Sequence, residues 1–380
     1  MPWKRVAAEL PPGDYYFSGS EAIAEGAIVA GCRYYAGYPI TPTTETLERI
    51  ADRFAEIGGT FIQMEDEIGS LASCIGASWA GAKAMTVTSG PGFSLMQEGI
   101  GYAIMTETPV VLVNAQRAGP STGQILVGSG DIMQARWGNH GGIPGIAISP
   151  WSVQELYDQC IRCFSLAERY RVPVMLMAEA TTAHLRERMT VGPEIEVFDR
   201  ERSPGAPPFG TEEDDGVPPM PAFGEGEKLL VTGSTHDAYG IRKASDAVAH
   251  QTLTTRLYNK VMKHTEDIVE HESYYMDDAE VAVVCYGFTA RSSLFAVQEL
   301  RKEGRKVGML RLKTLWPFAD RVVADVGAQV KKVFVPEMNL GQVVGEVVKY
   351  VDCDVVPYNQ MNGQVIEPGT IFEQLRRLPW

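Results

Sequence analysis

The sequence lacks any apolar run of the roughly 18 residues that a membrane-spanning helix requires. Its first residues, MPWKRVAAELPPGDYYF, also lack the apolar core of a secretory signal peptide. We therefore expect a protein that stays in the cytoplasm. Basic residues are in deficit as well, with 34 Lys and Arg against 48 Asp and Glu and a formal net charge of −14. Nucleic acid is not an expected partner, because a phosphate backbone requires a basic surface.

Cysteine is scarce, and its spacing excludes a disulfide framework in a large cytoplasmic chain. Cys160 and Cys163 form one C-x-x-C within a helical, largely apolar pattern. We expect both to pack in the core, because an iron–sulfur cluster generally requires four thiolates, and a redox pair is the alternative. The histidines show no metal-ligand spacing such as H-E-x-x-H, so we expect no metal site within this chain.

The length and the hydrophobic pattern predict two α/β domains. The 380 residues exceed the roughly 250 to 300 at which one core stops growing. Between residues 20 and 180, apolar runs alternate with helical patterns, which is typical of a parallel sheet with crossover helices. Ser18 and Glu21 form a candidate capping box at the first helix. The predicted strands lie at 33–36, 60–64, 84–88, 110–114 and 173–178.

The composition changes between the two predicted domains. Residues 193–228 are rich in proline, glycine and acid, and we expect an extended linker there. Residues 229–279 are a predicted connector, with a strand at LLVTG and a long helical region from about 238 to 272. Residues 280–380 again alternate, and they predict the second domain.

Candidate functional residues follow the predicted strands of the first domain. Thr41 is a candidate N-cap with Pro42 as the first helical residue, and a helix N-terminus there could hold a carboxylate. Glu67 adjoins apolar Ile68 and a small-residue helix, so it is a candidate buried acid for proton transfer, whereas Glu65 and Asp66 would remain solvated. Taken alone, Thr41 and Glu67 could equally serve only as helix caps.

Two further segments carry candidate ligand contacts. The turn Ser89-Gly-Pro-Gly92 would let a ligand approach the backbone, but no Gly-Lys-Ser/Thr follows, so it is not a Walker loop. Arg117 leaves the fourth strand and could bind a carboxylate, and Arg136 and His140 occupy the loop behind it. A surface ion pair is the alternative for each arginine. Because parallel strands present their carboxyl ends at one sheet edge, we expect these sites to converge.

The motifs GYPITPTTE, QMEDEIGSLASCIGASWAGA, QRAGPSTG, LAERYRVPV and PEMNLGQ resemble, in this order, the alpha subunit of 2-oxoacid:ferredoxin oxidoreductases. The resemblance spans roughly residues 18–375 and is strongest to the 2-oxoglutarate (KorA-type) subunits, through QMEDEIGS, SGPGFSLMQE and QARWGNHG. It implies a pyrimidine-type thiamin diphosphate-binding domain at 18–192 and a transketolase C-terminal-like domain at 280–380, within the α/β class.

The resemblance also implies roles for individual residues. Glu67 would hydrogen-bond N1′ of the thiamin diphosphate pyrimidine and so promote loss of the cofactor's C2 proton. Thr41 and Arg117 match family positions that hold the substrate's carboxylate and carbonyl. From their place in a loop that faces the same sheet edge, we expect Arg136 and His140 to contact the distal part of the substrate. Further cofactor contacts would come from Pro39, Ile40, Ser89, Gly90 and Pro91.

The resemblance implies partner subunits too, because thiamin enzymes hold the diphosphate through Mg²⁺ with a Gly-Asp-Gly motif that this sequence lacks. A beta subunit would carry the diphosphate site, the Mg²⁺ and a [4Fe–4S] cluster, with gamma and delta subunits as further components. Coenzyme A and ferredoxin would be the co-substrates of an oxidative decarboxylation of a 2-oxo acid to acyl-CoA and carbon dioxide.

Two segments bear on the identity of the substrate. The loop GQILVGSGD and the segment HGGIPG depart from the usual 2-oxoglutarate pattern, which has a proline-containing loop and His-Gly-Asp. We favour 2-oxoglutarate, with an aromatic, branched-chain or short 2-oxo acid as the alternative. A non-oxidative, transketolase-like thiamin subunit is the alternative from another reaction class.

Overall fold

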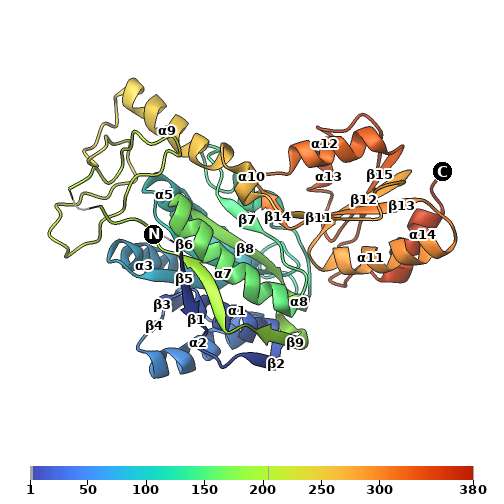
Figure 1. Ribbon diagram of the computed structural model, residues 1–380, viewed down its shortest axis with the longest axis horizontal. Helices are drawn as coiled ribbons and strands as arrows, with labels where there is room; N and C mark the ends of the chain where they lie inside the picture. The colour runs from blue at the N-terminus through green and yellow to red at the C-terminus, as the bar shows by residue number, and fades with distance from the viewer. Residues whose placement is uncertain (1–2, 204, 380) are drawn as a thin grey trace.

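The computed structural model describes residues 3–203 and 205–379. Figure 1 shows two α/β units side by side, the second formed by the C-terminal part of the chain. The larger unit contains a seven-stranded sheet in the order β14-β7-β8-β6-β5-β3-β4, and the smaller contains a five-stranded sheet in the order β11-β13-β12-β15-β16. The predicted α/β class is therefore confirmed.

The strands of the larger sheet are β3 (Cys32–Gly37), β4 (Thr60–Gln63), β5 (Lys83–Thr88), β6 (Val110–Gln116), β7 (Ile146–Ile148), β8 (Pro173–Glu179) and β14 (Thr314–Trp316). The smaller sheet comprises β11 (His271–Tyr274), β12 (Val281–Tyr286), β13 (Val307–Leu312), β15 (Lys332–Glu337) and β16 (Asp354–Asn359). Two antiparallel pairs lie apart from these sheets: β1 (Trp3–Ala7) with β10 (Glu194–Phe198), and β2 (Gly13–Ser18) with β9 (Arg186–Val191).

The helices of the first part of the chain are α1 (Gly19–Val29), α2 (Thr44–Ile57), α3 (Glu67–Trp79), α4 (Gly90–Leu95), α5 (Gln97–Met105), α6 (Ile132–Trp137), α7 (Val153–Tyr170) and α8 (Ala180–His184). Those of the later part are α9 (Ala247–Met262), α10 (Thr265–Ile268), α11 (Gly287–Lys302), α12 (Asp320–Gln329), α13 (Val344–Val347) and α14 (Pro368–Arg376).

The larger sheet is covered on both faces, which explains why its central strands are apolar throughout. Val111 and Val113 of β6 belong to the core that contains α1, α2 and α7. Leu112, between them, belongs to the core on the other face, together with α3 and α5. The strand period of two thus distributes one apolar run between two cores.

The sequence located most of these elements. All five strands predicted in the first domain are present, and the capping box is formed: the Ser18 amide donates to Glu21 Oε2 at 2.7 Å, and the Glu21 amide donates to Ser18 Oγ at 3.2 Å. Cys160 and Cys163 are buried on α7, and burial raises the pKa of the Cys163 thiol to about 12. This arrangement supports core packing rather than a redox pair.

The two units are joined through strand β14 and the side chain of Arg311. β14 comes from the C-terminal part of the chain but pairs antiparallel with β7 at the edge of the larger sheet. Arg311 is fully buried, donates to Glu155 of α7 and to Glu272 of β11, and lies 3.7 Å from the ring centroid of Trp151. The units are consequently fixed relative to each other.

The connector differs from its prediction. LLVTG is not a strand, the helix α9 begins only at Ala247, and the predicted helical region ends in the strand β11. The predicted linker includes β10 and the buried side chains of Phe209 and Met220. Arg171 explains how a proline-rich segment is held without a sheet, because its guanidinium donates to the carbonyls of Pro208, Pro218 and Pro219.

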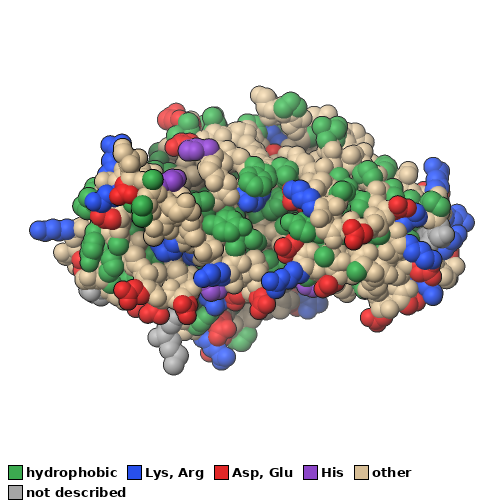
Figure 2. Space-filling model, turned by 90° about the horizontal axis from the view of Figure 1, so that it is seen from above, with side chains coloured by type: hydrophobic (Ala, Val, Ile, Leu, Met, Phe, Trp, Pro, Cys, Tyr) green, Lys and Arg blue, Asp and Glu red, His purple; other side chains and the backbone are tan. Residues whose placement is uncertain are grey.

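The surface offers no extended basic area on the face shown in Figure 2, where acidic and basic side chains are interspersed. Among residues 3–203 and 205–379, no helix combines the length and the apolar character that crossing a membrane would take.

A buried ion cluster fixes α9 to the first domain. Glu107 is completely buried; its carboxylate accepts from Arg256 Nη2 at 2.6 Å and from Lys260 Nζ at 2.7 Å. Despite its burial, these cations and Arg171 hold the pKa of Glu107 well below its usual range. Burial lowers the pKa of Lys260 to about 8.

We predict that Glu107→Gln lowers the free energy of unfolding by about 3 to 5 kcal/mol at pH 7, because it leaves buried cations uncompensated. The depressed pKa means that Glu107 contributes its stability above the ordinary carboxyl range, and that the contribution declines as the pH falls through and below that range. The difference between wild type and variant, measured by urea denaturation, should therefore narrow on acidification.

The matched control is Glu56→Gln, because Glu56 pairs with Arg53 but has a side chain that is 63% exposed. An exposed ion pair of this kind contributes at most about 1 kcal/mol. Equal effects of the two substitutions at pH 7 would contradict the role assigned to the buried cluster.

Candidate active site

The candidate residues converge at the carboxyl edge of the larger sheet. β3 is parallel to β4 and β5, β5 is parallel to β6, and β6 is parallel to β8. The segments that follow β3, β4, β5 and β6 therefore leave the sheet on the same side, where open α/β sheets bind ligands.

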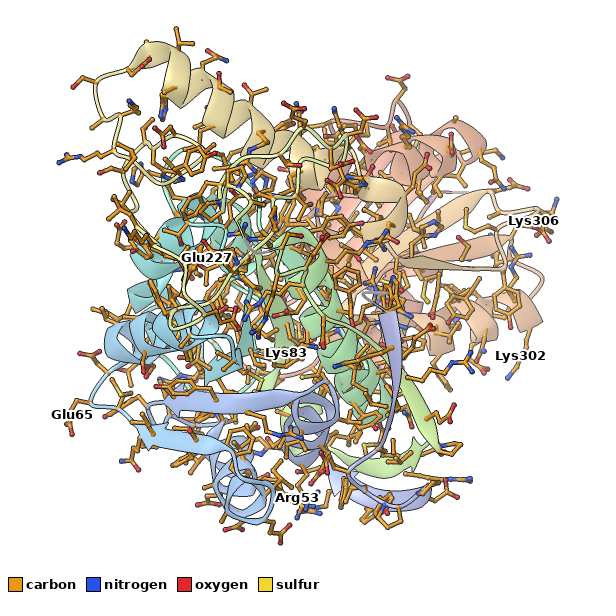
Figure 3. The ribbon with its side chains drawn as sticks, turned by 60° about the vertical axis from the view of Figure 1, so that its left-hand side comes forward. Arg53, Glu65, Lys83, Glu227, Lys302 and Lys306 are labelled. Atoms are coloured by element: carbon orange, nitrogen blue, oxygen red, sulfur yellow. The ribbon has the colours of Figure 1, made fainter. Side chains whose placement is uncertain are left out.

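Glu67 is the first residue of α3 and is only 4% exposed. The helix is capped by its neighbour, since Asp66 Oδ1 accepts from the Gly69 amide at 2.7 Å. Figure 3 shows Glu65 projecting outward from the loop that precedes α3. The structure thus confirms one buried acid beside two exposed ones, and it gives the capping role to Asp66 rather than Glu67.

The Glu67 carboxylate lies against the glycine turn that follows β5. A Cβ atom at Gly92 would come within 2.1 Å of both Glu67 Oε1 and Thr88 Oγ1, so only glycine permits this approach. Within the part of the chain that the structure describes, the carboxylate makes no hydrogen bond. A buried carboxylate without a partner is suited to bind a donor on a ligand.

The turn after β3 differs from its prediction. Helix α2 begins at Thr44 with Thr43 as its N-cap, so the assignment of Thr41 as the N-cap and Pro42 as the first helical residue is wrong. The reason is a preceding turn, in which the amide and the hydroxyl of Thr43 both donate to the Ile40 carbonyl, at 2.8 and 2.7 Å. Thr41 is exposed within this turn, and Pro39 and Ile40 are half-buried beside it.

Arg117 connects this turn to the end of β6. It is 6% exposed and donates from Nη1 to the Thr41 carbonyl at 2.8 Å. Its Nε is buried without a partner among the described residues, and no ion pair to Arg117 is found there. The structure therefore brings Thr41 and Arg117 together, and it leaves the other guanidinium donors of Arg117 without a partner among the described residues.

A cavity of about 340 Å³ lies beside Arg117, between the two units, and neither Glu67 nor Thr41 is among the residues that line it. Arg117, Gly90 and Pro91 line it from the first domain, and Met338 and Gln342 line it from the loop after β15. Ser89 is buried just below, where its hydroxyl donates to the Ala115 carbonyl at 2.9 Å. A small anionic ligand in this cavity would meet the Arg117 guanidinium.

Arg136 and His140 are not among the residues that line this cavity. Arg136 stacks on Trp137, with 3.7 Å to the ring centroid, and donates to the Gly142 carbonyl at 3.0 Å. His140 is exposed. The segment that contains them leads to β7, which is parallel to β8 and begins opposite the start of that strand. The segment therefore runs from the carboxyl edge of the sheet toward its amino edge. Their role in substrate recognition stays a prediction.

Residues of the cavity that sequence reasoning missed come from two places. Asp131 is the last residue of the altered loop GQILVGSGD, and Asn339 and Gln342 belong to the PEMNLGQ motif of the second domain. The first segment stands out in the sequence as a departure from the family pattern and the second as a match to it, but only the folded chain brings them to the same cavity. Among the described residues, no group of three or more His, Cys, Asp or Glu side chains is arranged to hold a metal ion.

Comparison with known families agrees with this geometry. A family model described as pyruvate flavodoxin/ferredoxin oxidoreductase, thiamine diphosphate-binding, matches residues 25–255. A second, described as pyruvate:ferredoxin oxidoreductase core domain II, matches residues 279–371.

Full-length relatives are also similar to this chain. The 2-oxoglutarate synthase subunit KorA of Methanothermobacter thermautotrophicus is 45% identical over 375 residues, which is 96% of this chain and 99% of the relative. The KorA subunit of Methanocaldococcus jannaschii is 47% identical over 370 residues, 95% and 98% of the two chains. The ketoisovalerate oxidoreductase subunit VorB of M. thermautotrophicus is 35% identical over 365 residues, 95% and 96%.

Among solved structures, a 2-oxoglutarate:ferredoxin oxidoreductase from Magnetococcus marinus, with 2-oxoglutarate, coenzyme A and succinyl-CoA bound, has a TM-score of 0.90 at 31% identity. The match covers 96% of this chain but only 65% of that one. A split gene transketolase, an inactive beta4 tetramer, has a TM-score of 0.54 at 14% identity over 94% and 93% of the two chains, which shows the fold alone. The chain therefore belongs to the 2-oxoacid:ferredoxin oxidoreductase family, and its relatives within that family include the KorA subunits.

Proposed function

We propose that this chain is the KorA-type alpha subunit of a 2-oxoglutarate:ferredoxin oxidoreductase. The reaction would convert 2-oxoglutarate, coenzyme A and two oxidised ferredoxins into succinyl-CoA, carbon dioxide, a proton and two reduced ferredoxins. The observation that carries the proposal is the buried, unpartnered carboxylate of Glu67 at the sheet edge where Arg117 and Thr41 meet. The similarity to KorA subunits over nearly the whole chain supports the choice of substrate.

The residues of this chain fit one half of thiamin diphosphate. Glu67 would accept a hydrogen bond from the aminopyrimidine, and the glycine at position 92 keeps the space beside the carboxylate open. Pro39, Ile40, Ser89, Gly90 and Pro91 would surround the ring. When bound, the cofactor supplies a carbon nucleophile for the 2-oxo carbon and accepts the electron pair that decarboxylation releases.

The remaining steps assigned to this chain are positioning steps. Arg117 would bind the carboxylate next to the 2-oxo group through its free guanidinium donors, while its bond to the Thr41 carbonyl fixes its direction. Holding the substrate in one orientation lowers the entropic part of the barrier. Arg136 and His140 would act on the distal part of the substrate only if the segment moves toward the cavity.

The other components would belong to partner subunits. A beta subunit would supply the diphosphate site, the Mg²⁺ and a [4Fe–4S] cluster, and gamma and delta subunits would complete a cytoplasmic complex. The absence of a Gly-Asp-Gly motif from the sequence supports this division. Electrons would leave through the cluster to ferredoxin.

The proposal is tested with the complex co-purified anaerobically with its native partners and supplied with thiamin diphosphate, Mg²⁺, coenzyme A and a viologen dye. Dye reduction with 2-oxoglutarate, and formation of succinyl-CoA, is the expected result. The panel should include 3-methyl-2-oxobutanoate, because a ketoisovalerate oxidoreductase subunit is also 35% identical to this chain. A fully loaded complex that reduces no dye with any 2-oxo acid would favour a non-oxidative thiamin enzyme.

We predict that Glu67→Gln lowers the turnover number by at least about a hundredfold, as expected when a proton-transfer group is removed. Assembly with the partner subunits, as measured by size-exclusion chromatography, should not change. The control is Glu65→Gln, which changes an exposed acid two residues away. A Glu67 variant that keeps full turnover would exclude it from cofactor activation and favour a subunit that only supports assembly.

We predict that Arg117→Ala lowers kcat/KM for the 2-oxo acid. The decrease should correspond to a loss of about 2 to 4 kcal/mol in transition-state stabilisation, as expected for a charge-assisted hydrogen bond at the reacting centre. Steady-state kinetics with the complete complex measures it. Arg188→Ala is the control, because the Arg188 side chain is 75% exposed and pairs with Asp14. Unchanged kinetics for Arg117→Ala would remove this residue from the site.

A further inference from the structure

The cavity beside Arg117 contains a second charged side chain, Asp131, which has no role in the function proposed above. Arg117 and Asp131 are the charged residues among those that line the cavity in the described part of the chain. A dicarboxylic 2-oxo acid brings two negative charges, and this chain supplies one cation for them. The question is which group meets the second carboxylate.

The neutral amide side chains of the cavity are already engaged. Gln342 accepts from the Met133 amide at 2.8 Å and donates to the Gly130 carbonyl at 2.6 Å. The Asn339 side chain donates to the Ser129 carbonyl at 2.8 Å, and its oxygen accepts from the backbone N–H of Gln342 at 3.0 Å. Asn339 Nδ2 also bonds Tyr286 Oη at 2.9 Å and has no donor to spare, whereas Gln342 Nε2 keeps one N–H that no described residue accepts.

The hydroxyl of Ser94 is engaged in the same way. It donates to the Gly90 carbonyl at 3.3 Å and accepts from Gln134 Nε2 at 2.9 Å. Ser121 is exposed. Among the half-buried side chains of the cavity, Asp131 is the carboxyl group, and no described residue bonds its Oδ1.

Asp131 does not serve its own helix. It stands at the N-cap position of α6 but makes no capping hydrogen bond, because Gln342 of the second domain takes the Met133 amide instead. Its Oδ2 accepts from Asn114 Nδ2 at 2.9 Å and lies 3.7 Å from the position that a Cβ atom at Gly90 would occupy. Its Oδ1 makes no hydrogen bond to any described residue.

The surroundings of Asp131 increase the affinity of its carboxyl group for a proton. Burial raises the pKa of its carboxyl group, and the hydrogen bond from Asn114 offsets this only in part. The groups that face it are Gly90 and Ser94 of α4, Asn114 of β6, Gln342 of the second domain and, as the one ion across the cavity, Arg117. A bound anion would favour protonation further.

We propose that Asp131, carrying a proton, donates a hydrogen bond from Oδ1 to the second carboxylate of a dicarboxylic 2-oxo acid whose first carboxylate is bound by Arg117. The inference rests on the proposed function and names a substrate-selecting residue for it. The substrate then binds with a proton on Asp131, and an ionised Asp131 repels it. A monocarboxylic 2-oxo acid places no charge beside Asp131.

The test compares wild type, Asp131→Asn and Asp131→Ala in the complete complex, with 2-oxoglutarate and 2-oxobutyrate as substrates between pH 5.5 and 8.5. For the wild type, the KM for 2-oxoglutarate should rise with pH, with a limiting slope of about tenfold per pH unit for one proton. The KM for 2-oxobutyrate should not follow it. Asp131→Asn keeps a donor, so its KM for 2-oxoglutarate should stay low and independent of pH.

Asp131→Ala should raise the KM for 2-oxoglutarate by about tenfold to a hundredfold, as expected for a lost hydrogen bond to a charged group. Turnover of 2-oxobutyrate should be retained. The control is Asp158→Asn, because burial also raises the pKa of Asp158, which lies on α7 and does not line the cavity. It should leave the wild-type pH profile in place.

A second readout does not require turnover. Calorimetric binding of 2-oxoglutarate to the complex without thiamin diphosphate, in buffers of different ionisation enthalpy, should show proton uptake by the wild type and less by Asp131→Asn. A pH profile that is the same in Asp131→Asn as in wild type, or an equal loss for both substrates in Asp131→Ala, would overturn the proposal. An increased KM for coenzyme A alone would do so as well.

The outcomes separate this inference from the function on which it rests. A complex that oxidises 2-oxoglutarate with the same pH profile in Asp131→Asn as in wild type would overturn the role of Asp131 and leave the proposed function standing. No dye reduction with any 2-oxo acid would refute the reaction itself, and the proton uptake on binding would then decide on Asp131.

Discussion

The buried guanidinium of Arg311 determines how the two units of this protein meet. It comes from β13 of the second unit and reaches Glu155 at the start of α7 in the first. Because a buried cation without its partners is strongly unfavourable, the two units cannot separate at this point without a large cost. The loop after β15, which forms one wall of the cavity, adds its own contacts to the first unit through Asn339 and Gln342.

The cavity between the two units has a mixed origin. The first unit contributes the strand ends and the glycine turn, which any open α/β sheet could present to a ligand. The second unit contributes Gln342. Its side-chain oxygen accepts a hydrogen bond from the Met133 amide of α6, which an N-cap residue such as Asp131 would ordinarily bind. Asp131 therefore lines the cavity without capping its helix, because Gln342 bonds the Met133 amide in its place.

The sequence predicted the strands and the buried acid, because both depend on local patterns. Continuous apolar runs revealed β5, β6 and β8, and the apolar neighbour of Glu67 distinguished it from Glu65 and Asp66. The start of α2 was wrong by two residues, since TPTT contains several residues that can cap and only the turn at Ile40 decides between them.

Other parts depend on contacts that no local pattern encodes. The direction of the segment with Arg136 and His140 follows from the pairing of β7 with β8, and β7 is only three residues long. β14 joins a sheet formed by residues more than a hundred positions earlier. The cavity residues of the second unit are recognisable as a motif, but their place is set by tertiary structure.

The proline-rich segment after β10 is held by arginines that bind its carbonyl groups rather than its side chains. Every residue type has a carbonyl, so most replacements along this segment would leave those hydrogen bonds intact. The path of the segment is therefore determined in part by Arg171, which lies outside the segment. Apart from buried side chains such as Phe209 and Met220, the sequence of the segment is free to vary in composition and charge, so surface properties can change there without altering the fold beneath.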